Sequence, residues 1–444
     1  MVQPAEMDAQ PAGTLDAGGL RRVLVVLCVT EIVSWGVLYY AFPVLAPSIA
    51  ADTGWSVSMI TAGFSTGLVV SALVGIPAGR WLDRIGPRPV MTVGSVLGVP
   101  AVVGIALAPN LPSFFAAWAL AGVAMAGTLY PPAFAALTRW WGPQRVRALT
   151  ALTLLAGLAS TIFAPTAAAL LGQLGWRHTY LALAVVLAVI TIPAHLFGLR
   201  GRWPDPGHTE HRHSGQQGAA EHAPREVMRS RAFLLLVPAI ALGTFAAFAV
   251  VVNQVPLLIE RGLSTSDAAW ALGLGGLGQV LGRLGYGRLT TALSVRMRAV
   301  VILALSAAAT LLLGLLPGPE VLLIAAAMLA GAARGVFTLL QATAVSDRWG
   351  AAHYGLLNGL LSAPSMIATA LAPWAGAAIA VALGGYPGVF VLLAATAALA
   401  ALLATGTVPR HDKPTTVPRD PDSSFTRPPE AAADAGQDGS PPTR

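Results

Sequence analysis

Long apolar stretches, separated by short polar segments, make up most of this chain. We count twelve of them, each near the roughly 20 residues that an α-helix needs to cross a bilayer. Their approximate ranges are 22–45, 57–79, 89–108, 112–137, 148–171, 176–198, 232–257, 268–287, 299–316, 320–344, 355–380 and 386–406. The pattern predicts an all-α polytopic membrane protein with twelve transmembrane helices.

The twelve stretches form two sets of six around a polar segment. Residues 199–231 contain Pro, Gly, Gln and His without apolar periodicity, which predicts a flexible linker. The end of the chain is rich in Pro, Asp, Ser and Thr, which predicts disorder. The expected organisation is a tail (1–21), a six-helix bundle (22–198), the linker (199–231), a second bundle (232–406) and a tail (407–444).

The two halves repeat at a constant offset. Gly79-Arg80 matches Gly287-Arg288, and 287 minus 79 is 208. The same offset relates Trp141-Gly142 to Trp349-Gly350. These matches predict duplicated bundles related by an axis along the membrane normal.

Charge is sparse and unevenly placed. The mean hydropathy is +0.68 with only 11% charged residues, which excludes a soluble protein of this length. With the N-terminus in the cytoplasm, 24 of the 27 basic residues lie on the cytoplasmic side, and only Arg177 and Arg261 lie outside. The positive-inside rule therefore predicts that both termini are cytoplasmic. The net charge of +7 reflects this topology and does not indicate nucleic-acid binding.

The composition also indicates where the protein resides. An excess of Ala, Gly, Pro and Arg with a single lysine, Lys413, is typical of a GC-rich bacterial genome. Residues 1–20 lack the regions of a cleavable signal peptide. The single cysteine, Cys28, excludes an intramolecular disulfide. We expect a multi-pass monomer in the bacterial inner (plasma) membrane, in contact with membrane lipid.

The loop between the second and third stretches carries a motif. It reads Gly-Arg-Trp-Leu-Asp-Arg-Ile-Gly-Pro-Arg-Pro over residues 79–89. This spacing resembles the signature loop of the major facilitator superfamily of secondary transporters, at Gly79, Asp83, Arg84, Gly86 and Arg88. The resemblance covers residues 22–406 and implies alternating access by two bundles that rock about a central site.

The resemblance further implies that the loop is a conformational latch. Its acid, Asp83, would accept from a helix N-terminus and pair with basic neighbours, which would hold the outward-facing state. Thr291 stands at the matching position of the second half. We therefore expect the latch to be one-sided.

Two charged residues lie deep in apolar stretches. Glu31 is about 13 Å and Arg334 about 15 Å from the cytoplasmic face at about 1.5 Å per residue. A charge at this depth costs about 2.5–3.5 kcal/mol, so each needs a partner or a hydrated cavity. The resemblance implies that helices 1, 4, 7 and 10 line a central cavity, and these residues lie on helices 1 and 10. At the 208 offset they match Ala239 and Ala126, which favours a functional role.

Several roles are open for these residues. Arg334 could bind an anionic group with its planar fork, while Glu31 could carry a coupling proton. Alternatively they could form a structural ion pair, or Glu31 could reach towards lipid headgroups. Other candidates for the substrate pocket combine an apolar body with a polar group, although such residues also occur in interfacial belts. They are Trp35, Tyr39, Tyr130, Asn253 and Gln341.

Two short segments are similar to the monocarboxylate and oxalate–formate branch, and they imply a small carboxylate-type anion as substrate, possibly with protons. They are residues 53–56 and 175–177. Members of that branch often carry a substrate arginine on helix 8, where this chain is uncharged until Arg283, at the expected inner end. One alternative is a proton-coupled drug or metabolite efflux antiporter, whose helix 5 motif ends in Gly-Pro where this chain has Ala164-Pro165. A remote alternative is a non-transporting sensor or scaffold.

Other activities lack support in the sequence. There is no Gly-x4-Gly-Lys-Ser/Thr motif for an ATP-driven pump and no hydrolase motif, so we expect neither an enzyme nor a cofactor. Four linker histidines have only loose metal-ligand spacing and no nearby cysteine, so we expect no metal site. They are His208, His211, His213 and His222.

Overall fold

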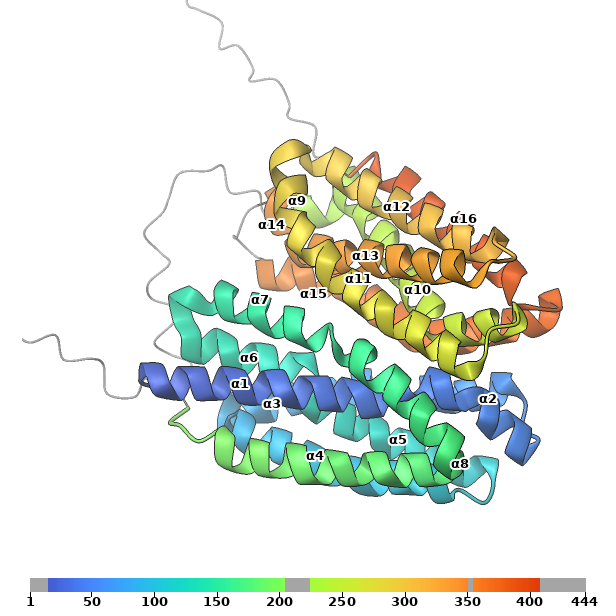
Figure 1. The fold of residues 1–444 in the computed structure, drawn as a ribbon. Coiled ribbons are helices and arrows are strands. Elements are labelled where there is room, and N and C mark those ends of the chain that lie inside the picture. Colours follow the sequence, from blue (N-terminus) through green and yellow to red (C-terminus); the bar gives the residue numbers. More distant parts are fainter. Residues whose placement is uncertain (1–14, 204–223, 350–353, 408–444) are drawn as a thin grey trace, which may run out of the picture. The chain divides into compact units, whose positions relative to one another are not determined.

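The computed structural model describes residues 15–203, 224–349 and 354–407, which all belong to one compact unit. The linker histidines therefore lie outside the described residues. Helices of the first half gather in one bundle and those of the second half in another (Figure 1). Helices and turns make up the described ranges, which hold no strand, so the predicted all-α fold is confirmed.

The helices follow the chain in two series. The first comprises α1 (Ala17–Trp35), η1 (Gly36–Tyr40), α2 (Ala41–Thr53), α3 (Val57–Ile85), α4 (Pro87–Leu107), α5 (Leu111–Thr128), α6 (Tyr130–Trp141), η2 (Gly142–Gln144), α7 (Arg145–Ala156), α8 (Ala159–Pro193) and η3 (Ala194–Gly198). The second comprises α9 (Pro224–Arg229), α10 (Arg231–Glu260), α11 (Thr265–Ala292), α12 (Val295–Leu315), α13 (Glu320–Thr343), α14 (Ser346–Trp349), α15 (Tyr354–Leu383) and α16 (Tyr386–Ala404).

Ten helical segments of the described chain are long and apolar enough to cross a membrane. One of them, Arg145–Gly198, contains two spans, because the chain leaves helical geometry at Gly175 (φ 72°). The helix α11 is outside the ten, because its many glycines and a buried arginine lower its hydropathy. With both included, the described residues form the twelve spans that the apolar pattern predicts.

The far ends of the two bundles are built alike, at the 208 offset. We call the end near residues 15, 203, 224 and 407 the terminal end, and the opposite end the far end (Figure 1). At the far end, the side chains of Ser56 and Ser264 cap α3 and α11. The carboxylate of Asp52 accepts from Trp176 Nε1 at 3.0 Å, and that of Glu260 accepts from the backbone nitrogen of Tyr386 at 2.8 Å.

Glycines bring α11 and α13 into unusually close contact. A Cβ atom added at Gly331 would overlap the carbonyl oxygen of Gly275, and one added at Gly335 would overlap that of Gln279. Small residues allow membrane helices to approach until their backbones touch. The helix pair therefore tolerates no side chain at these positions.

The two bundles meet mainly along α3 with α15 and along α8 with α11. Two of the hydrogen bonds that join them lie in the far-end half of these helices. The hydroxyl of Thr161 donates to the carbonyl oxygen of Gly273 at 2.8 Å, and the backbone nitrogen of Trp374 donates to the hydroxyl of Ser65 at 3.2 Å. The bundles are thus held together towards the far end.

Candidate functional site

A cavity of about 150 Å³ lies between the bundles. Its walls come from α1, η1, α6 and α7 of the first half and from α10, α11 and α13 of the second. Five of the six residues predicted for a substrate pocket line it: Trp35, Tyr39, Tyr130, Arg334 and Gln341. The cavity thus gathers candidates from three distant parts of the chain.

The wall from the first half is aromatic. The ring centroid of Trp35 lies 5.1 Å from that of Tyr130 and 5.3 Å from that of Tyr39. Two local features of the chain set these positions. The π-helical turn η1 carries Tyr39, and π-helical turns often occur at functional sites. Helical geometry is interrupted at Leu129, and α6 begins at the next residue, Tyr130, which is followed by two prolines.

The wall from the second half carries the charged and amide side chains of the cavity, next to apolar residues. Arg334 donates from Nη2 to Gln279 Oε1 at 2.9 Å, while its Nε is buried without a partner among the described residues. Gln341 donates from Nε2 to the hydroxyl of Thr244 at 2.7 Å. This side of the cavity therefore offers N–H donors to a solute.

The cavity is also lined by a second arginine, Arg283, which the sequence analysis did not select. Arg283 is almost fully buried, and its guanidinium donates to the carbonyl oxygen of Thr153 on α7, across the bundle interface. We expected Arg283 at the inner end of its helix. The helix continues to Ala292, nine residues further (292 minus 283), which is about 13 Å at 1.5 Å per residue.

Glu31 is fully buried, and neither carboxylate oxygen has a partner among the described residues. It forms no ion pair with Arg334 in this structure, and its side chain is not exposed at the surface of the described chain. It lies close enough to Tyr130 to interact with it electrostatically. A lone carboxyl is thus buried beside the aromatic wall of the cavity.

Asn253 is the predicted pocket residue that the cavity does not include. Its amide nitrogen donates to the carbonyl oxygen of Ala249 in its own helix at 2.8 Å, and its side chain packs against Gly376 of α15. The side chain is therefore directed at the bundle contact rather than at the cavity.

The signature loop lies at the terminal end. Arg139 of α6 donates to Asp83 Oδ1 at 2.7 Å, and Arg88 donates to the carbonyl oxygen of Leu196 at 2.8 Å. Gly86 has a φ of 82° and contacts Trp203, while Gly79 has open space around it and Arg84 is exposed. Within the described chain, Asp83 pairs with a basic neighbour but accepts no bond from a helix N-terminus.

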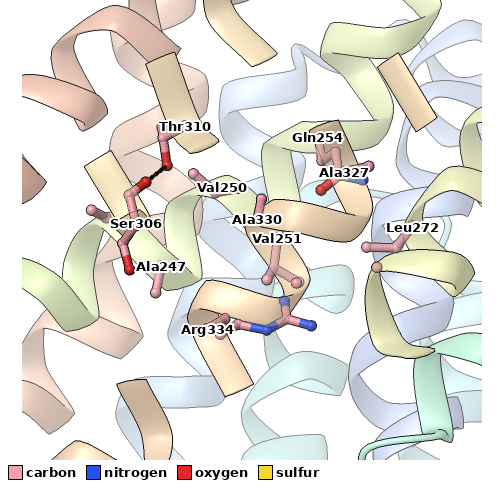
Figure 2. A pocket seen from close by; sticks show the side chains of 13 residues that line it. Ala247, Val250, Val251, Gln254, Leu272, Ser306, Thr310, Ala327, Ala330 and Arg334 are labelled. Carbon is pink, nitrogen blue, oxygen red and sulfur yellow. Dashed lines mark hydrogen bonds between the residues drawn. The ribbon is translucent and has the colours of Figure 1, made fainter. Parts of the chain in front are cut away.

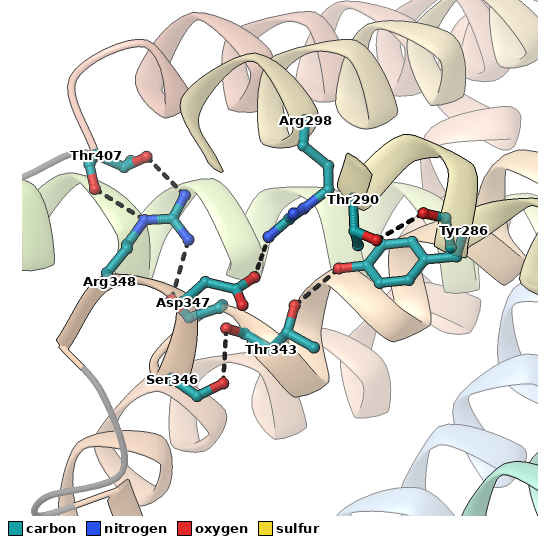
Figure 3. A network of polar contacts seen from close by, with 10 residues as sticks. Tyr286, Thr290, Arg298, Thr343, Ser346, Asp347, Arg348 and Thr407 are labelled. Atoms are coloured by element: carbon teal, nitrogen blue, oxygen red, sulfur yellow. Dashed lines mark hydrogen bonds and ion pairs between the residues drawn. The ribbon is translucent and has the colours of Figure 1, made fainter. Parts of the chain in front are cut away.

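The second half has an ion pair of its own at this end (Figure 3). Arg298 of α12 pairs with Asp347 of α14, and Arg348 donates to the hydroxyl and the backbone oxygen of Thr407. Burial lowers the pKa of Arg348 to about 10, so it remains charged at neutral pH. Asp347 stands where Arg139 stands in the first half (347 minus 139 is 208), but its partner Arg298 corresponds to Val90 of α4 (298 minus 208 is 90), so the second ion pair joins a different pair of helices. Thr291 takes no part in this pair and donates to the carbonyl oxygens of Gly287 and Arg288, so the one-sided latch at the motif position stays a prediction.

The two ion pairs should differ in their contribution to stability. The side chains of Arg139 and Asp83 are 22% and 59% exposed, whereas those of Arg298 and Asp347 are 5% and 25% exposed. We expect Asp83→Ala to cost about 0.2–1 kcal/mol, as for exposed pairs. Asp347→Ala should cost about 3 kcal/mol, because it leaves a buried guanidinium unpaired. Thermal unfolding of both variants in the same detergent measures the difference, and equal losses would contradict it.

Comparisons with known proteins agree on one family. The sequence matches the family model described as Major Facilitator Superfamily over residues 27–319 and 241–433. It is 28% identical to human "Monocarboxylate transporter 11" over 63% of this chain and 58% of that protein. It is 23% identical to the "Oxalate:formate antiporter" of Oxalobacter formigenes over 89% of this chain and 93% of that protein.

A solved structure shows the same fold. It is a bacterial homologue of the human lysosomal transporter Spinster, in an inward-facing and occupied conformation. The two chains superpose with a TM-score of 0.69 at 17% sequence identity, over 88% of this chain and 97% of the other.

Proposed function

Because this chain belongs to the Major Facilitator Superfamily and is a secondary transporter, we propose that its central cavity carries a small carboxylate-type anion by alternating access. One observation carries the proposal: two arginines, Arg283 and Arg334, line a cavity that has no Asp or Glu among its described lining residues. A cation would find no counter-charge on these walls.

The chemistry of the lining suits a carboxylate. The guanidinium fork matches two carboxylate oxygens, and charge-assisted hydrogen bonds are about twice as strong as neutral ones. The hydroxyls of Tyr39 and Tyr130 and the amides of Gln279 and Gln341 lie around the same space. The aromatic wall would contact the apolar part of the solute.

We place the terminal end in the cytoplasm of a bacterial cell, because the basic residues of the loops concentrate there. The contacts between Thr161 and Gly273 and between Ser65 and Trp374 then close the periplasmic side. In this arrangement residues 22–198 and 232–406 are the two moving bundles. Glu31 carries a coupling proton, because it is an ionisable side chain buried beside the cavity without a cationic partner among the described residues.

Proton-coupled efflux of lipophilic solutes is the second candidate function. The observation that favours it is the aromatic wall of Trp35, Tyr39 and Tyr130, joined by Phe248 and Phe337. Such a wall would also hold a flat lipophilic solute, including a lipophilic cation over the aromatic faces. The two candidates differ in their need for the arginines.

The experiment is solute flux in proteoliposomes under an imposed pH gradient. A panel of small carboxylates is compared with a panel of lipophilic cations in the wild-type protein. We expect saturable flux of a labelled carboxylate. Adding the same carboxylate without label should inhibit this flux. Flux of the cations alone would overturn the anion proposal in favour of efflux.

A further inference from the structure

A second, smaller pocket lies behind Arg334, within the second bundle. Its volume is about 20 Å³, and residues of α10, α11, α12 and α13 line it (Figure 2). Arg334 lines both this pocket and the central cavity. Because a pocket needs roughly 10–15 Å³ to hold one water molecule, the pocket has room for one.

The polar groups of this pocket are of two kinds. Gln254 is 3% exposed, and its Nε2 has no hydrogen-bond partner among the described residues. The hydroxyls of Ser306 and Thr310 already donate to carbonyl oxygens of their own helix, at 3.0 and 2.8 Å. Figure 2 shows the bond from Thr310. The two hydroxyls therefore present only lone pairs to the pocket.

This combination selects the ligand. An anion would be attracted by the amide and the guanidinium but repelled by the two hydroxyl oxygens. An apolar group would leave the buried amide unsatisfied, which costs about 1–3 kcal/mol. A water molecule can accept from the nitrogen and donate to the hydroxyls, and buried waters typically make about three such bonds.

We propose that this pocket is a binding site for one structural water molecule, which bridges Gln254 on α10 and Thr310 on α12 beside the guanidinium of Arg334. The site does not depend on the identity of the transported solute. Arg334 lines the same pocket, so its guanidinium is a further donor for this water.

A double-mutant cycle tests the bridge in the full-length protein. Gln254→Leu removes the donor, and Thr310→Val removes the acceptor without changing the shape of the side chain. If one water links them, its loss is counted only once, so the Tm of the double variant should lie about 2 °C above the additive expectation. Thr310→Ser keeps the hydroxyl and should abolish this non-additivity.

A matched pair calibrates the cycle. Gln341→Leu with Thr244→Val breaks a direct hydrogen bond between the same residue types, at 2.7 Å, and must show coupling. In addition, a density map of the wild-type protein that resolves ordered waters should show a peak within about 3 Å of Gln254 Nε2. Additive losses in the Gln254–Thr310 cycle, or a pocket without density in such a map, would overturn the proposal whatever the protein transports.

Discussion

Replacing Arg334 with alanine should strongly reduce carboxylate transport. A bidentate guanidinium–carboxylate contact has two hydrogen bonds of about 1.5 kcal/mol each or more, so the loss should reach about 100-fold at sub-saturating substrate. Arg334→Lys keeps the charge but loses the fork, so we expect an intermediate loss of about tenfold. Initial rates of labelled carboxylate uptake into proteoliposomes, normalised to the amount of reconstituted protein, measure both changes.

Arg261→Ala is the matched control for this experiment. Arg261 is a partly buried arginine at the far end, where it donates to the carbonyl oxygen of Gly314 at 2.7 Å, and it does not line the central cavity. Its loss should leave the apparent affinity for the carboxylate within about twofold of wild type, because exposed or remote charges act weakly. If Arg334→Ala transported the carboxylate as well as Arg261→Ala does, the anion-binding role of Arg334 would be wrong.

Glu31→Gln should separate exchange from proton-driven accumulation. The amide has the shape of the carboxyl but cannot release a proton, so the variant should lose essentially all accumulation against a gradient that is driven by ΔpH. Exchange of labelled for unlabelled carboxylate without a gradient should continue, because the arginines remain in place. Both assays use the same vesicles, so the ratio of ΔpH-driven accumulation to exchange is the decisive quantity.

Glu260→Gln tests whether any acid would give this result. The carboxylate of Glu260 accepts from the backbone of Tyr386 at the far end, a role that concerns the start of α16 rather than the cavity. This variant should keep the wild-type ratio of accumulation to exchange. If Glu31→Gln kept proton-driven accumulation, the proposed coupling role of Glu31 would be wrong.

Hydropathy predicted the fold well, because burial in lipid leaves few choices to a backbone. Every peptide group in a bilayer must be hydrogen-bonded within its own segment, so an apolar stretch of sufficient length becomes a helix. The repeat was equally visible in the sequence, as the caps of Ser56 and Ser264 show. Knowing which helices line the cavity in this superfamily was enough to select Arg334 and the three aromatic residues.

The remaining differences between the sequence predictions and the structure arise from features that hydropathy does not describe. Helix α11 continues beyond its apolar stretch, and this displaced Arg283 from the expected rim into the cavity. Asn253 lies on a cavity-lining helix but on the face that contacts α15, and only packing decides between faces. The pair of Arg298 with Asp347 was missed because neither residue occupies the position that matches Asp83, whereas the motif comparison asked only for an acid at Thr291.

The close contact of α11 with α13 has a consequence for selectivity. Arg283 belongs to one of these helices and Arg334 to the other, and their backbones touch at Gly275 with Gly331 and at Gln279 with Gly335. Packing this close prevents one helix from sliding past the other. The two guanidinium groups should therefore move together as one rigid unit when the bundles rock. The separation of positive charge offered to a solute is then the same on both sides of the membrane. A carrier built in this way would present the same distance between its two guanidinium groups to the substrate throughout the transport cycle.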